Sequence, residues 1–106
     1  MLIELRPSNI TLPNITVQEK YLDGALISHV LTANEGYVIY DTSANDVAPR
    51  PDPETGEIIP VPITYYFREA TIPVRVPVEN WTWVAVLEST VPADQIFGGG
   101  DDHEIA

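Results

Sequence analysis

Apolar and polar residues alternate most clearly in the segment 62–72, which begins Pro-Ile-Thr-Tyr-Tyr-Phe. In an extended chain Ile63, Tyr65 and Phe67 lie on one face, and the residues between them lie on the other. This alternation predicts a central strand in a sheet that has one packed and one solvated face. The segment 36–41, Gly-Tyr-Val-Ile-Tyr-Asp, has the same character and is the expected pairing partner.

Further segments of the chain have the pattern of short strands. Residues 2–5 alternate and stop at a proline, and 71–78 alternates between two prolines. In 81–87 both faces are largely apolar, which is typical of an interior strand.

The segments 15–22 and 25–32 are separated by Asp23-Gly24. Asp-Gly between two apolar runs predicts a two-residue hairpin, because a type I′ turn needs positive φ at both central residues. A helix over 21–33 is the alternative, since leucine and valine recur there at every fourth position. The hairpin is the favoured interpretation.

Residues 42–62 form a Pro-rich excursion that contains five of the ten prolines. A loop of this length inside a compact domain is uncommon and is usually functional or mobile. The sequence 52–56, Asp-Pro-Glu-Thr-Gly, predicts that the excursion folds back as a small hairpin. Pro60 and Pro62 remove donors from the same side of a strand, which indicates an edge.

We therefore predict an all-β domain over residues 1–97, built as a small antiparallel sandwich or open barrel of six or seven short strands. Residues 98–106 are expected to be a flexible acidic tail because three glycines precede Asp-Asp-His-Glu. The expected core residues are Leu5, Ile15, Val17, Ile27, Val38, Ile39, Ile63, Tyr65, Phe67, Ile72, Val74, Trp83, Val84 and Val86.

The charge and the composition limit the classes of partner. Sixteen acidic and five basic residues give a net charge of −11, which argues against direct binding to nucleic acid or to an anionic membrane. There is no cysteine, so disulfides and thiolate chemistry are excluded. No apolar run has the length of a signal peptide or a transmembrane helix, and we expect a cytoplasmic or virion-associated protein.

The sequence offers little for catalysis or for metal binding. Its two histidines, His29 and His103, lie in no catalytic motif, so we expect no enzyme and no cofactor. The spacing of Asp41, Ser43 and Asn45 matches part of a calcium loop, but Asp46 stands where such a loop needs glycine. No metal site is predicted.

Aromatic residues are the only candidates for a ligand site. Trp81 and Trp83, with Tyr65, Tyr37 or Tyr40, could form a platform on which a sugar stacks. The simpler interpretation is that these rings form the core. The candidate ligand-binding residues are Trp81, Tyr65 and Tyr37.

Four scattered pieces of sequence, 36–42, 52–57, 64–66 and 97–103, resemble small uncharacterised proteins of gut-bacterial and prophage genomes. The resemblance is confined to scattered pieces of the chain and implies no activity and no site residues. It favours a component of a virion or of its assembly.

Three functions are consistent with these observations. The first is a non-enzymatic structural or interaction module that binds a protein partner or self-associates through Pro-marked edge strands. The alternatives are a carbohydrate-binding module that uses Trp81 and Trp83, and an acidic inhibitor that mimics nucleic acid. The sequence does not identify the partner, the oligomeric state or the role of the 42–62 loop.

Overall fold

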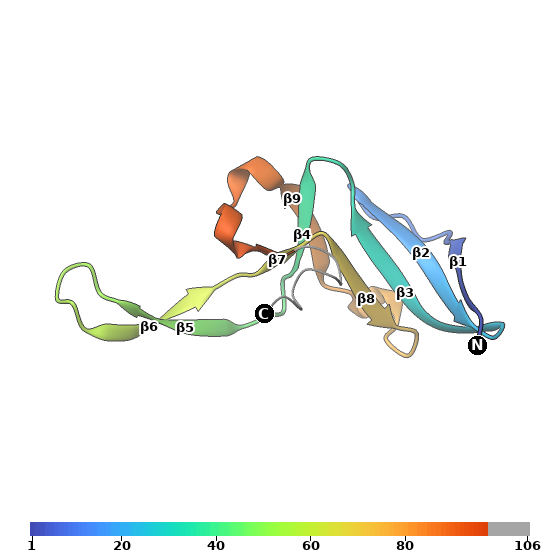
Figure 1. The fold of residues 1–106 in the computed structure, drawn as a ribbon, viewed down its shortest axis with the longest axis horizontal. Coiled ribbons are helices and arrows are strands. Elements are labelled where there is room, and N and C mark those ends of the chain that lie inside the picture. The colour runs from blue at the N-terminus through green and yellow to red at the C-terminus, as the bar shows by residue number, and fades with distance from the viewer. Residues whose placement is uncertain (98–106) are drawn as a thin grey trace.

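The computed structural model describes residues 1–97, which form ten short strands in two four-stranded sheets and one two-stranded ribbon (Figure 1). The all-β prediction is confirmed. Within the described residues the two larger sheets have a sandwich-like, open arrangement, and neither closes into a barrel. The strands outnumber the six or seven expected, because the segment 62–72 is divided among three strands and a further short strand forms at 96–97. The predicted acidic tail, 98–106, lies outside the described residues.

The first sheet has the strand order β1-β2-β3-β8, with every neighbouring pair antiparallel. These strands are β1 (Ile3–Pro7), β2 (Ile15–Leu22), β3 (Ala25–Ala33) and β8 (Glu69–Pro73). β1 and β8 are its edges.

The turn between β2 and β3 confirms the predicted hairpin. Asp23 and Gly24 have φ values of 50° and 86°, as a type I′ turn requires. The carboxylate of Asp23 also accepts a hydrogen bond of 2.8 Å from the N–H of Leu2, which ties β1 to the turn. The alternative helix over 21–33 is wrong, because cross-strand pairing outweighs the fourfold spacing of apolar residues.

The second sheet has the order β10-β7-β4-β9. It consists of β4 (Tyr37–Asp41), β7 (Tyr66–Phe67), β9 (Trp83–Leu87) and β10 (Ile96–Phe97). β10 runs parallel to β7, and the other pairs are antiparallel. Three short 3-10 helices connect or follow the strands: η1 (Val78–Asn80), η2 (Glu88–Thr90) and η3 (Ala93–Gln95).

The single central strand predicted over 62–72 is wrong. The segment contributes to β6 (Ile58–Ile63), β7 and β8, with interruptions at 64–65 and at Arg68. Each piece pairs with a different strand, and β7 meets the expected partner β4 only at Ile39 and Phe67. Alternation of apolar and polar residues indicates an extended backbone, but it does not indicate which strand each part of that backbone pairs with.

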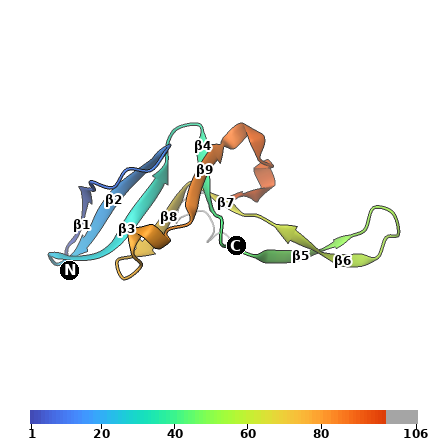
Figure 2. The same cartoon turned by 180° about the vertical axis from the view of Figure 1, so that it is seen from behind.

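The Pro-rich excursion forms a β-hairpin that projects from the sandwich, as Figures 1 and 2 both show. β5 (Asp46–Pro51) pairs antiparallel with β6 in a separate two-stranded sheet. We call residues 46–63 the arm. With the arm, the molecule measures 57 × 28 × 24 Å. The predicted fold-back at 52–56 is confirmed, and Gly56 at its end has a φ of 80°.

The core lies between the two larger sheets. Its buried members are Ile15, Val17, Leu31 and Ile72 from the first sheet and Ile39 from the second. Half-buried aromatic residues pack against this cluster, namely Phe67, Trp81 and Trp83. No residue of the arm belongs to it.

Most predicted core positions are buried or half-buried, but four are wrong. Leu5, Ile27, Val74 and Val84 are exposed by 50%, 37%, 45% and 39%. Leu5 lies on an edge strand and Val74 in the turn after β8, so neither has a second sheet over it. The fully buried Leu31 was not among the predictions.

Candidate functional site

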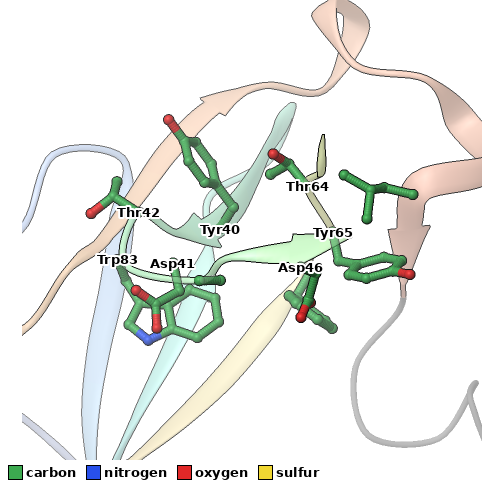
Figure 3. Close-up of a pocket in the computed structure, with 10 residues that line it drawn as sticks. Tyr40, Asp41, Thr42, Asp46, Thr64, Tyr65 and Trp83 are labelled. Carbon is green, nitrogen blue, oxygen red and sulfur yellow. The ribbon is translucent and has the colours of Figure 1, made fainter. Parts of the chain in front are cut away.

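A cavity of about 350 Å³ lies where the arm joins the second sheet. Figure 3 shows the side chains around it. They come from the end of β4 and the turn after it, from both strands at the base of the arm, from β7 and the link before it, and from β9. The lining residues are Tyr40, Asp41, Thr42, Ala44, Asp46, Ile63, Thr64, Tyr65, Phe67 and Trp83.

Asp41 is held in place at the end of β4. Its Oδ1 accepts hydrogen bonds from the N–H of Ser43 (2.9 Å), from the hydroxyl of Ser43 (2.7 Å) and from the hydroxyl of Thr82. Burial raises the pKa of Asp41, but these donors lower it more, so the net pKa is below its usual value. The Asp41 carboxylate is therefore ionised at neutral pH.

The second carboxylate of the cavity is Asp46, the first residue of β5. Asp46 pairs across the arm with Ile63, so both residues lie on the same face at the base of the arm. Within residues 1–97, the side chain of Asp46 makes no hydrogen bond and no ion pair. Its charge is available to a ligand.

Aromatic rings form much of the remaining wall. The Trp83 ring packs edge-on against Phe67, with 5.9 Å between ring centroids. Tyr40 makes a similar contact with Tyr66 at 5.4 Å. These contacts fix the rings, so the cavity is bounded by side chains with little freedom to move.

The three predicted ligand-binding residues are not brought together. Tyr65 lines the cavity. Trp81 instead packs against His29, at 5.1 Å between ring centroids, and its indole N–H donates to the carbonyl of Val76. Tyr37 lies at the other end of β4, where it pairs with Leu87.

No sequence pattern directly indicates the two carboxylates in this cavity. Asp41 is the first position of the incomplete calcium loop, and in the structure its Oδ1 closes the turn at Ser43. The Asp-x-Ser spacing is a signal for such a turn. No group of three histidine or acidic residues suited to a metal ion occurs in the part of the chain that the structure describes.

The arm provides a second candidate site, a surface for protein contact. One face of it carries only apolar side chains, all of them exposed: Val47, Pro49, Pro51, Ile58, Pro60 and Pro62. Val47 and Ile58 are exposed by 59% and 66%. We call these six residues the apolar face of the arm.

The same prolines block the edges of the arm. Pro49 and Pro60 are paired, and proline has no N–H, so the ladder must be formed by the alternate pairs. The N–H of Asp52 donates to the carbonyl of Glu57, which continues this series of alternate hydrogen-bonded pairs towards the tip of the arm. The residues whose backbone N–H and C=O groups point away from the ladder are therefore those of the apolar face. Among these six residues only Val47 and Ile58 have a backbone N–H to donate. Continuous strand pairing along either edge of the arm is disfavoured.

Comparison with protein-family models, with curated proteins and with solved structures found no match for this chain. Among the described residues, no helix is long and apolar enough to cross a membrane. The cavity and the arm are therefore the two features from which a function can be inferred.

Proposed function

We propose that this chain is a non-enzymatic interaction module that assembles with copies of itself through the arm. Such a role suits a component of a phage or prophage virion, or of its assembly. The observation that supports it best is the projecting arm, because all six residues of its apolar face are exposed. Covering exposed apolar side chains with a partner removes them from water, which favours association.

The partner we propose is a second copy of the chain. A second exposed apolar surface lies at the opposite end of the molecule, around β1, as the labels in Figures 1 and 2 show. There Met1, Leu2, Ile3 and Leu5 are exposed by 49% to 96%. Two unlike apolar surfaces at opposite ends favour a head-to-tail contact, which generates a ring or a filament.

Local charges fit the same contact. The turn at the tip of the arm contains Asp52, Glu54 and Glu57. At the other end, Lys20 pairs with Leu5 and thus lies on the same face of the first sheet. An acidic tip placed near Lys20 would find a cation of opposite charge beside an apolar surface.

The apolar face of the arm is too small to form a stable interface alone. Six residues on two strands cover on the order of 200 Å², whereas a stable interface needs about 800 Å² on each partner. The arm must therefore be joined by part of the sandwich, and the exposed residues around β1 would supply this area.

The test is a sedimentation or light-scattering series over protein concentration. We expect the wild type to self-associate and Ile58→Asp to weaken association by at least about tenfold, because it places a charge in the apolar contact. Ser89→Asp is the matched control, since it adds the same charge at an exposed position of η2, outside both the arm and β1. A wild type that stays monomeric at about 1 mM, or equal effects of both variants, contradicts the proposal.

Edge-strand pairing remains the other route to self-association. Strand pairing is possible at the edge strand β1, because the backbone N–H and C=O groups of Ile3 and Leu5 point away from β2. Leu5→Pro removes an outward donor while leaving the ladder to β2 intact. If Leu5→Pro abolishes association and Ile58→Asp does not, pairing at β1 replaces the arm contact.

The two alternative functions stay predictions. Trp81 and Trp83 pack against different rings, His29 and Phe67, so they do not form the joint platform that carbohydrate binding by the tryptophans requires. The acidic-mimic hypothesis rests on the net charge of −11 alone.

A further inference from the structure

We propose that the cavity at the base of the arm binds an organic cation, an ammonium or guanidinium group carried on an apolar stem. This site does not rest on the proposed self-assembly. It follows from the volume, the charges and the rings around the cavity.

The volume suits a ligand of this size. A cavity of about 350 Å³ is at the lower end of the range for small-molecule sites. It can hold the side chain of an arginine or lysine, or a free alkyl cation of similar length.

The charges favour a cation over an anion or a neutral molecule. Asp41 and Asp46 both line the cavity, and none of the lining residues is basic. The chain also has a net charge of −11, so its field attracts cations towards the surface.

Both carboxylates have oxygen atoms available. The three donors to Asp41 all bind Oδ1, so Oδ2 has no partner among the described residues. Asp46 likewise has no hydrogen-bonding partner there. A planar guanidinium or an ammonium group supplies several N–H donors for such oxygens.

The rings complete the chemistry. Trp83, Tyr40 and Tyr65 line the same cavity as the two carboxylates. Aromatic faces attract cations and also pack against an alkyl stem. Carboxylates alone would bind a hydrated metal ion equally well, but the aromatic walls favour a cation with an apolar part.

The experiment titrates the protein with n-butylguanidinium and with n-butylammonium. Binding is measured from the NMR signals of the two indole N–H groups. Trp83 lines the cavity, whereas the indole N–H of Trp81 is bound to Val76 elsewhere. We expect saturable shifts of the Trp83 signal, with a Kd on the order of 1 mM, and an unchanged Trp81 signal. n-Butanol, which has the stem without the charge, should produce no shift.

Two variants test the charges. Asp46→Asn should weaken binding about tenfold, while Asp94→Asn, an exposed carboxylate outside the cavity, should have no effect. Equal effects would indicate general attraction to an acidic protein and would overturn the site. Binding of glucose or n-butanol as strong as that of the cations would also overturn it.

A capped Gly-Arg-Gly peptide distinguishes the two sources of the ligand. Tighter binding of the peptide than of n-butylguanidinium supports a basic side chain of a protein partner, and weaker binding supports a free small cation. The measurements are made on Ile58→Asp, which keeps the cavity intact. Failure of self-assembly therefore leaves this test unaffected.

Discussion

At the scale of single residues, His29 is the most unusual position. The residue is only 8% exposed, and its Nδ1 has no hydrogen-bond partner in the described part of the chain. The ring lies on the core face of β3, opposite Glu19 and Ile72. It packs at a steep angle to the Trp81 ring, with 5.1 Å between ring centroids. A buried polar atom without a partner reduces stability.

Substitution of His29 by phenylalanine should therefore be tolerated. The new ring keeps the aromatic contact with Trp81 and removes the unpaired nitrogen, so the free energy of unfolding should stay the same or rise by about 1 kcal/mol. Urea denaturation measures this. His29→Asn keeps a buried polar group without the ring and should lower the free energy by about 1–3 kcal/mol. A loss of that size in the phenylalanine variant would show that the imidazole has a polar partner.

At the scale of elements, the sequence predicted the hairpins better than the sheets. Asp23-Gly24 and the turn at 52–56 depend on local backbone chemistry, and both formed as predicted. The assignment of 62–72 to one strand was wrong because three different partners share that segment. The cavity could not be predicted for a related reason. Asp41, Asp46 and Trp83 meet only through the order of strands, which no local pattern records.

The arm should be dispensable for folding, because it forms its own sheet and contributes nothing to the core cluster. Ala48 and Val61 are a hydrogen-bonded pair by the phase of the ladder, so residues 49–60 can be replaced by Asn-Gly in a two-residue turn. We expect the free energy of unfolding to change by less than about 1 kcal/mol in urea denaturation.

Leu31→Ala is the positive control for this measurement. Leu31 is fully buried, and its truncation should cost about 2–5 kcal/mol. A comparable loss on shortening the arm would show that the arm supports the sandwich. The shortened protein should also lose self-association while keeping Asp46 and the cation site.

At the scale of the whole molecule, the excess of negative charge opposes the fold. The chain carries a net charge of −11, and the structure shows two ion pairs within residues 1–97, Arg6–Glu4 and Arg68–Glu88. Both are solvent-exposed, so they compensate little of the repulsion among carboxylates. This repulsion is greater in the compact state than in the unfolded chain, because folding brings the charges closer together.

Salt should therefore stabilise the protein. Raising NaCl from about 0.02 to 0.5 M shortens the Debye length from roughly 20 Å to about 4 Å, which screens most pairs of surface charges. We expect the free energy of unfolding to rise by about 1 kcal/mol, equivalent to about 4–8 °C in Tm, measured by thermal denaturation at low protein concentration. A variant with Glu57, Glu79 and Asp94 changed to their amides should be more stable at low salt and respond less to NaCl, since all three carboxylates are exposed. If the variant and the wild type respond equally, charge repulsion is not the cause.

Binding of n-butylguanidinium should change in the opposite direction, because the same screening weakens its attraction to Asp41 and Asp46. The fold and the cation site are thus expected to have salt dependences of opposite sign, as follows when one excess of carboxylates destabilises the compact chain and attracts its ligand.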